Sequence, residues 1–285
     1  MLPRNPHGLV SIGLLMHAVA CTDDVVLPPV NKKIGTEWSK ALQDISTPSG
    51  IHIERLKEHQ DTLEAYLGWA SVHGPHTNSW GESKEDRRIG FLLNVHNAAV
   101  LHNLLRNDFP NSPDRITTGP FQWPGSGFYW GTRYKVDKEW TSLKHLAVHD
   151  TVNRYAEPLL WMALFDGTKD SPILRWWPKK KGKLQPRLER AAKRFVNSDR
   201  GMSKTADGWA INPLFLTHEK DFLDWTDSIN LCEWMTRYAK GERKRWLNQQ
   251  KENCTLTPKP SNRATDIATA PSKTNRQKAT HGAGG

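Results

Sequence analysis

Side chains capable of acid, base or nucleophilic chemistry are concentrated in one short stretch, residues 159–174. Residues 159–165 are apolar and uncharged, and they are too few for an ordinary helix, so they predict a buried central strand. A polar loop follows, with Asp166, Asp170 and then Ser171 directly before a proline. Because proline pushes the preceding residue towards an extended conformation, we expect Ser171 to be exposed, where its hydroxyl could act as a nucleophile.

A serine hydroxyl needs a positioned base before it can attack a carbonyl group. His145 and His149 are spaced one helical turn apart, and either could be that base. Asp166, Asp170 or Asn97 could orient the imidazole. Together with the loop serine, these residues form the hypothesis of a hydrolase or acyl-transferase.

The same two histidines have a spacing that can hold a metal ion, and Asp150 follows them. The glutamate that stands between the histidines of a zinc-protease helix is missing, and the spacing indicates no third ligand. We therefore predict no metal and no cofactor, with two surface or half-buried histidines as the simpler interpretation.

The longest helical pattern of the chain covers residues 85–107. Asn94, His96 and Asn97 lie within its apolar sequence. A buried amide costs free energy unless it is hydrogen-bonded, so we expect the asparagines to pin neighbouring segments. A role in orienting a catalytic group is the alternative, and His96 joins them as a candidate binding residue.

Three motifs agree with one known pattern. The loop reads Gly-x-x-x-Ser-Pro-x-Leu-Arg after its apolar run, the helix contains Asn-Val-His-Asn-Ala at 94–98, and Asp221-Phe222 follows a late apolar segment. In these features the chain resembles the family known as domain of unknown function 547 over residues 83–225. The resemblance implies an α+β fold, possibly of papain or transglutaminase type, and by analogy thiol chemistry in the loop.

Three substitutions separate the chain from that family, whose loop typically reads His-Phe-Ala-Leu-x-Cys-Gly-x-x-Ser-Cys-Pro-x-Leu. Trp161 stands at the histidine, Asp166 at the first cysteine and Ser171 at the second. A serine hydroxyl is far less acidic than a thiol, so it does not simply inherit the thiol's role. We therefore favour a non-catalytic binding or scaffold derivative, with the Ser171 hydrolase as the alternative.

The elements that must position these residues form a single α+β domain at residues 36–240, a small and mainly antiparallel sheet packed by helices. Residues 21–35 are a proline-containing segment without periodicity and predict a tether. Residues 241–285 lack an apolar period over most of their length and predict a disordered basic tail.

The N-terminus predicts export. Residues 1–20 combine a basic residue, an apolar run and small residues before Cys21, a pattern typical of a signal peptide. The same junction resembles a bacterial lipobox, so Cys21 is a candidate for lipidation and the membrane a partner through that anchor. We expect a bacterial cell-envelope location, lipid-anchored or else periplasmic or secreted. Cys232 and Cys254 could then pair or remain independent thiols.

Positive charge is uneven along the chain, whose net charge is +10. Residues 175–194 contain nine lysines and arginines and a single acid, Glu189, and within them residues 179–194 predict a basic helix. Arg175, Trp176 and Trp177 begin this region and, with Trp161 and Asn94, complete the candidate binding residues. A polyanionic or envelope partner suits it, nucleic acid is the least expected partner, and an ordinary solvated face is the simpler interpretation.

Overall fold

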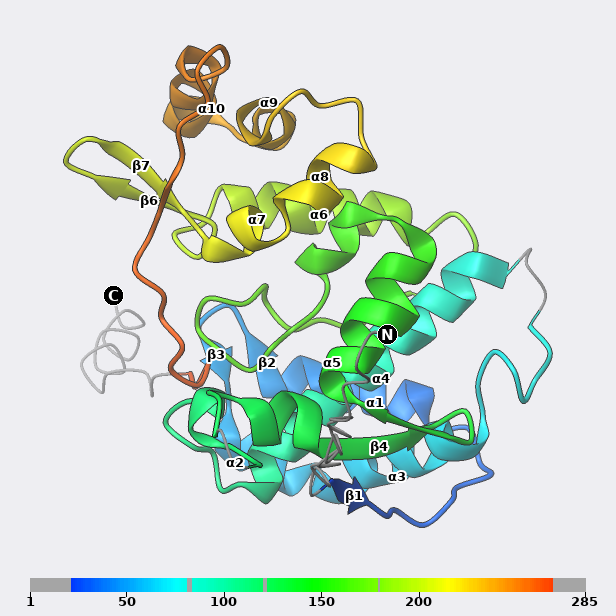
Figure 1. Cartoon of the computed structure of the whole chain (residues 1–285). Helices are drawn as coiled ribbons and strands as arrows, with labels where there is room; N and C mark the ends of the chain where they lie inside the picture. Colours follow the sequence, from blue (N-terminus) through cyan, green and yellow to red (C-terminus); the bar gives the residue numbers. More distant parts are fainter. Residues whose placement is uncertain (1–21, 81–83, 120–121, 179, 269–285) are drawn as a thin grey trace, which may run out of the picture.

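The computed structural model describes residues 22–80, 84–119, 122–178 and 180–268. The expected signal peptide, Cys21 and the last part of the expected tail lie outside this range. The protein has an α+β fold with about 49% helix and 12% strand, in which small, mostly antiparallel sheets are packed by helices, as the sequence predicts (Figure 1).

The first half of the fold surrounds a hydrophobic cluster built on the long helix α4 (lower half of Figure 1). Its elements are β1 (Asp23–Val25), α1 (Gly35–Ile45), β2 (Ser46–Thr47), β3 (Gly50–Ile51), α2 (Ile53–Glu58), α3 (Gln60–Val72), α4 (Glu85–Arg106), η2 (Pro113–Arg115), η3 (Ser126–Gly131), β4 (Thr132–Val136), β5 (Glu139–Ser142), α5 (Leu143–His145) and η4 (Leu146–Asn153).

The second half surrounds a second hydrophobic cluster (upper half of Figure 1). Its elements are η5 (Pro158–Met162), α6 (Gln185–Val196), β6 (Met202–Thr205), β7 (Gly208–Ile211), α7 (Pro213–Thr217), α8 (Glu219–Asp224), α9 (Leu231–Thr236), α10 (Gly241–Gln249) and β8 (Thr257–Pro258). A disulfide joins Cys232 to Cys254 in this half, which selects one of the two alternatives left open by the sequence.

Three small sheets connect these elements, in the orders β1-β4-β5, β2-β3 and β6-β7-β8. The pairs β2-β3, β4-β5 and β6-β7 are antiparallel, whereas β1 pairs with β4, and β8 with β7, in parallel. The aromatic region at 122–136 contributes only β4 to a hairpin. Its glycine-rich part forms η3, and β4 pairs with β5 across Asp137 and Lys138, both at positive φ.

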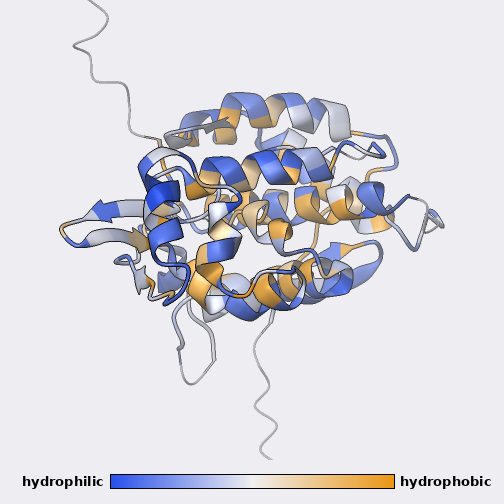
Figure 2. Ribbon diagram, turned by 90° about the horizontal axis from the view of Figure 1, so that it is seen from above, coloured by the Kyte–Doolittle hydropathy of each residue, from blue (hydrophilic) through white to orange (hydrophobic). Residues whose placement is uncertain are grey.

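Helices carry hydrophobic and hydrophilic residues side by side, as Figure 2 shows. In α6 the buried residues Leu188, Ala191, Ala192, Phe195 and Val196 follow helical spacing, as predicted. Helix α4 is different, because nearly all of it beyond the first turn is buried. It therefore forms the centre of the molecule, and its amides meet protein on every side.

The predicted central strand at 159–165 is wrong. The segment begins as the 3₁₀ helix η5. Residues 159–164 are buried in the second cluster and Phe165 in the first, and none of them pairs in a sheet. Glu157 caps this helix by accepting a hydrogen bond from the Leu159 amide, and Pro158 provides the fixed φ of its first turn. An apolar run indicates burial more reliably than it indicates strand.

Two other expectations are corrected. The expected tether at 21–35 contains β1, which pairs with β4. The expected tail at 241–285 contains α10 and β8, and residues 259–268, which we call the strap, run back along the molecule to β3 (orange in Figure 1). The strap has no apolar period in its sequence, and polar contacts hold it in place. In the described ranges, no helix is long and apolar enough to cross a membrane.

Candidate functional site

A cavity of about 380 Å³, which we call the central cavity, is lined by residues from both hydrophobic clusters. Helices α4, α5 and α7, the segments η3 and η5, the loop at 164–172 and the strap all contribute to its wall. Five residues selected from the sequence line it: His96, Trp161, Asp166, Asp170 and Ser171. Ligand pockets range from about 300 to 1,000 Å³, so the cavity suits a small molecule.

Ser171 is buried, with 3% of its surface exposed, so the expected exposure is wrong. Its amide donates to the Thr168 carbonyl at 3.1 Å and its Oγ donates to the same oxygen at 2.9 Å, which folds the loop into a turn. Arg200 also donates to the Ser171 carbonyl. Within the described residues, the hydroxyl has no hydrogen bond to an imidazole. It closes a turn and is not poised to attack a substrate.

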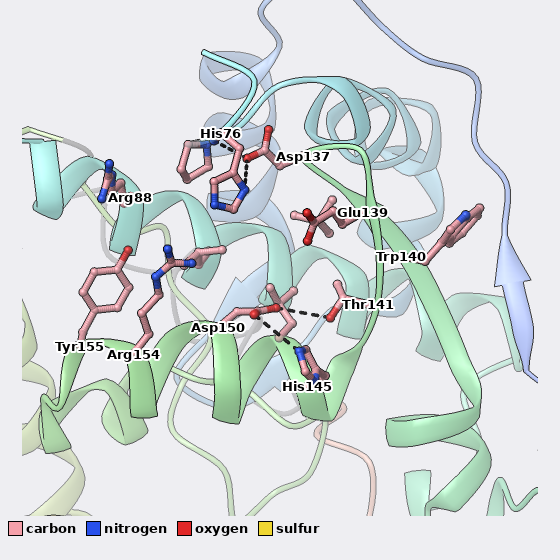
Figure 3. A pocket seen from close by; sticks show the side chains of 14 residues that line it. His76, Arg88, Asp137, Glu139, Trp140, Thr141, His145, Asp150, Arg154 and Tyr155 are labelled. Carbon is pink, nitrogen blue, oxygen red and sulfur yellow. Dashed lines mark hydrogen bonds and ion pairs between the residues drawn. The ribbon is translucent and has the colours of Figure 1, made fainter. Parts of the chain in front are cut away.

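The two candidate bases lie elsewhere. His145 and His149 are exposed and stack on one another with ring centroids 4.7 Å apart. His145 Nε2 is 3.6 Å from Asp150 Oδ1, and both residues line a separate recess of about 100 Å³ (Figure 3). The described residues therefore contain no Ser171–His145 or Ser171–His149 pair, and the proposed catalytic arrangement is not assembled.

That second recess also contains a carboxylate–histidine contact that the sequence analysis did not identify. Asp137 accepts hydrogen bonds from the amides of His76 and Thr77, and the His76 ring lies 3.2 Å from the same carboxylate (Figure 3). Burial raises the pKa of Asp150. Among the described residues no group of three or more histidines, cysteines or acids could hold a metal ion, so this recess offers no metal site.

Asp166 and Asp170 anchor the strap. Asp166 accepts from Arg263 Nη1 at 2.6 Å and from the Thr168 amide at 2.9 Å. Asp170 pairs with Lys259 Nζ at 2.5 Å and accepts from the Asn262 amide. The two loop carboxylates are therefore used to hold another part of the chain, and neither orients an imidazole.

Arg263 is the centre of this attachment. Its guanidinium contacts both Asp114 oxygens at 3.0 Å and also donates to the Tyr129 hydroxyl at 3.1 Å. That hydroxyl donates in turn to the Asp166 carbonyl at 2.8 Å. The carboxylates raise the pKa of Arg263 despite its burial. Further along the strap, Asp266 forms a two-fold pair with Arg200.

The α4 amides pin neighbouring backbone, as the structural interpretation predicts. Asn94 donates to the Trp177 carbonyl at 2.9 Å and accepts from the Trp177 amide at 2.8 Å. Asn97 donates to the Ala163 carbonyl and accepts from the Phe165 amide. Each side chain thus supplies one donor and one acceptor, as a neighbouring strand would. These bonds explain how non-helical backbone can be buried beside a helix.

Trp161, at the position where the resembled family has histidine, forms a cluster with Asp221 of the late Asp-Phe motif and with His218 just before it. Its indole stacks on His218, with centroids 3.5 Å apart and ring planes 21° apart. Its Nε1 donates to Asp221 Oδ2 at 2.9 Å, and His218 Nδ1 lies 3.5 Å from the same oxygen. The Asp221 carboxylate therefore contacts both the indole N–H of Trp161 and the imidazole of His218. His218 was missed by the sequence analysis, although it precedes the Asp-Phe motif by three residues.

Both imidazoles that line the cavity are neutral at neutral pH. Burial lowers the pKa of His96 to about 4, against a weaker opposing effect of its contact with Asn97. Burial also lowers the pKa of His218 to about 4, and the positive charge of Lys144 contributes. The cavity thus contains imidazoles that can donate or accept a hydrogen bond but carry no charge.

Lys144 is the cation that remains available in the cavity. It is half-buried, burial lowers its pKa, and within the described residues it makes no hydrogen bond or ion pair. Asp166 raises its pKa from a distance, but that carboxylate is bound by Arg263. The sequence analysis missed Lys144, which directly follows the Ser142-Leu143 start of α5.

The other candidate binding residues do not line the cavity. Trp177 is fully buried in the second cluster, and Trp176 is half-buried against the first, edge-on to Tyr66. Arg175 lies at a surface recess beside α6. The two tryptophans are core residues, whereas Arg175 belongs to a different surface.

Within the described residues, no hydroxyl that lines the central cavity is hydrogen-bonded to an imidazole. The cavity combines a flat aromatic wall at Trp161, an exposed indole at Trp130 and one amine without a counter-ion. Such a combination selects a small ligand that has a flat or apolar part and a negative group. Comparisons of the chain with family models, curated proteins and solved structures found no match.

Proposed function

We propose that the protein is an exported, non-catalytic binding protein of the bacterial cell envelope, which binds a small anionic ligand in the central cavity. The observation that carries this proposal is the Lys144 amine, which is half-buried, lines the same cavity as Trp161 and has no partner among the described residues. A buried cation is costly without a counter-charge. A bound carboxylate or phosphate would supply that charge.

Three features support binding over catalysis. The two positions where the resembled family has cysteines hold Asp166 and Ser171, and both side chains are engaged in bonds within the chain. Trp161 donates a hydrogen bond from its indole N–H to Asp221. Each of the three replacing side chains forms a hydrogen bond within the protein, so none presents a free reactive atom to a substrate. The protein is thus proposed as a derivative of that family that retains the fold and has lost the chemistry.

Export is supported by the signal-like N-terminus and by the Cys232–Cys254 disulfide, because disulfides persist in oxidising compartments. Attachment to a membrane would occur through a lipid on Cys21. In a bacterial host the full chain should incorporate labelled palmitate, and Cys21→Ser should not. Retention of the label by Cys21→Ser would exclude this anchor.

The binding proposal is tested with four compounds of matched shape. Benzoate and phenyl phosphate carry a negative group on a flat ring, whereas benzyl alcohol is neutral and benzylamine is positive. We expect the two anions to bind and to change the tryptophan fluorescence. Lys144→Met should weaken their binding at least about ten-fold, as loss of a charged hydrogen bond of roughly 1.5–3 kcal/mol implies.

Lys135→Met is the matched control, because Lys135 is exposed on β4. It should leave the affinity unchanged. Equal binding of benzylamine, or an unchanged affinity in Lys144→Met, would contradict the proposal. A fluorophosphonate probe should not label the protein, and labelling that disappears in Ser171→Ala would restore the hydrolase alternative.

A further inference from the structure

A second charged surface lies outside the central cavity, on α6 and the segment before it. Arg187, Arg190 and Arg194 are spaced by three and four residues, so they share one face of the helix. The buried residues of α6 lie on the other side. Arg175 and Arg194 line the same shallow recess. We call these four arginines the arginine face.

The arginine face has no counter-charge within the described part of the chain. None of its four guanidinium groups forms an ion pair or hydrogen bond there, whereas Arg200 and Arg263 hold aspartates in two-fold pairs. Burial lowers the pKa of Arg194 and of Arg175, and the charges that lower it further are other arginines of the same face. The fold therefore places four positive charges close to one another, and their mutual repulsion reduces the stability of the folded protein.

The geometry of the face suits a chain of anions. Arg187 and Arg194 are seven residues apart, which corresponds to about 10 Å along a helix axis. Guanidinium groups bind phosphates and carboxylates through two parallel hydrogen bonds. A row of such groups can engage successive anions of one extended molecule, whereas a single small anion could satisfy only part of it.

Two other anionic partners suit the face less well. A helix that lies on a membrane needs exposed apolar side chains beside its cations, and the exposed large hydrophobic residues of the described chain, at positions 26, 123, 130, 140 and 229, are not on α6. Single-stranded nucleic acid needs exposed aromatic rings for base stacking. The nearby Trp176 and Trp177 are packed in the two cores.

We propose that the arginine face binds a linear polyanion without bases, whose repeating phosphates or carboxylates pair with Arg175, Arg187, Arg190 and Arg194. This surface is separate from the central cavity and does not depend on its ligand. In an exported protein, an acidic polymer of the envelope has the required chemistry.

The test uses the full chain and linear polyphosphate, with affinity measured over a series of salt concentrations. Arg190→Gln and Arg194→Gln should each weaken binding about three- to ten-fold and reduce the slope of log affinity against log salt by about one. Neither variant should lower the urea midpoint of unfolding, because each relieves repulsion. An unchanged midpoint would show that a loss of affinity comes from the missing guanidinium group and not from unfolding of the variant.

Arg55→Gln is the matched control, because it removes the same charge from an exposed arginine that pairs with Glu58. It should change the affinity less than two-fold. An equal loss in Arg55→Gln, or no loss in Arg190→Gln, would overturn the proposal. Tighter binding of single-stranded DNA or of phosphatidylglycerol vesicles than of polyphosphate would overturn the choice of partner.

The two binding proposals fail independently. Lys144→Met should leave polyphosphate binding unchanged, and Arg190→Gln should leave benzoate binding unchanged. A variant that impairs both would indicate a general effect of charge or folding and would count against the arginine face as a separate site.

Discussion

At the scale of single residues, the chain uses side chains with chemical potential mainly to satisfy its own backbone and charges. Ser171 closes a turn, Asn94 and Asn97 replace a missing strand partner, and Asp166 and Asp170 hold the strap. The residues that remain uncommitted in the cavity are less conspicuous in the sequence. A reactive residue type near a proline or glycine therefore indicates a structural requirement as readily as a catalytic one.

The buried imidazoles predict a specific dependence of stability on pH. The pKa of His96, His102 and His218 is about 4 in the folded protein, lowered by burial, against about 6.5 in an unfolded chain. The unfolded state thus binds more protons between these values, so stability should fall as pH decreases from 6.5 to 4. The slope should approach about 1.4 kcal/mol per pH unit for each histidine.

Urea unfolding at several pH values between 7 and 4 measures this slope. His96→Asn should reduce it, because that variant removes one of the three groups. His149→Asn is the matched control, because it removes an imidazole from an exposed position. A slope that is the same in His96→Asn and the unchanged protein would show that His96 is not a source of the effect.

Sequence patterns indicated some of these residues and not others. Asn94 and Asn97 could be identified because polar amides within an apolar helix need partners. Lys144 and Arg263 could not, because their importance depends on which charges the fold brings near them. His218 was close to a quoted motif, but nothing in its spacing revealed that it stacks on Trp161.

At the scale of elements, the strap is the part of the fold that periodicity could not predict. Amphipathic helices such as α1 and α6 follow from apolar spacing. The strap is ordered by ion pairs and backbone hydrogen bonds, including Asp266 N to Gly167 O at 2.9 Å and Lys169 N to Ala264 O at 2.8 Å. Such contacts join residues about 100 positions apart, and local sequence contains no record of the partner.

Arg263→Gln should release the strap. The change leaves Asp114 and Asp166 without their cation, and the expected loss of stability is about 1–3 kcal/mol, because the groups are partly exposed to solvent. Amide hydrogen exchange should accelerate at Asp266 and Lys169, whose hydrogen bonds join the strap to the loop.

Arg55→Gln again provides the control, since its pair with Glu58 is exposed and should contribute less than about 0.5 kcal/mol. Exchange at Asp266 and Lys169 should then remain slow. If Arg263→Gln also leaves both amides protected, the arginine does not hold the strap and the backbone hydrogen bonds are sufficient.

At the scale of the whole molecule, two hydrophobic clusters share one cavity, and the proposed binding surfaces lie in different places. The arginine face is on α6 in the upper half of Figure 1, whereas β1, which begins two residues after Cys21, lies at the bottom. The arginine face and β1 therefore belong to opposite halves of the fold.

The Cys232–Cys254 disulfide should stabilise the second half of the fold. The two cysteines are 22 residues apart, and closing a loop of this length in the unfolded chain corresponds to about 3 kcal/mol. Urea unfolding with and without a reductant should show a lower midpoint for the reduced protein. The reductant should have no further effect on Cys254→Ser, and an unchanged midpoint in the original protein would contradict the assignment.

The position of the strap also sets an order of events during synthesis. The cavity-lining residues between positions 96 and 218 leave the ribosome before residues 261 and 263, which complete the lining of the central cavity. A nascent chain interrupted near residue 250 would already hold most of its helices, but Asp114, Asp166 and Asp170 would lack their partners. The lining of the central cavity is therefore complete only once the strap is in place, and the proposed ligand site depends on one of the last segments to be synthesised.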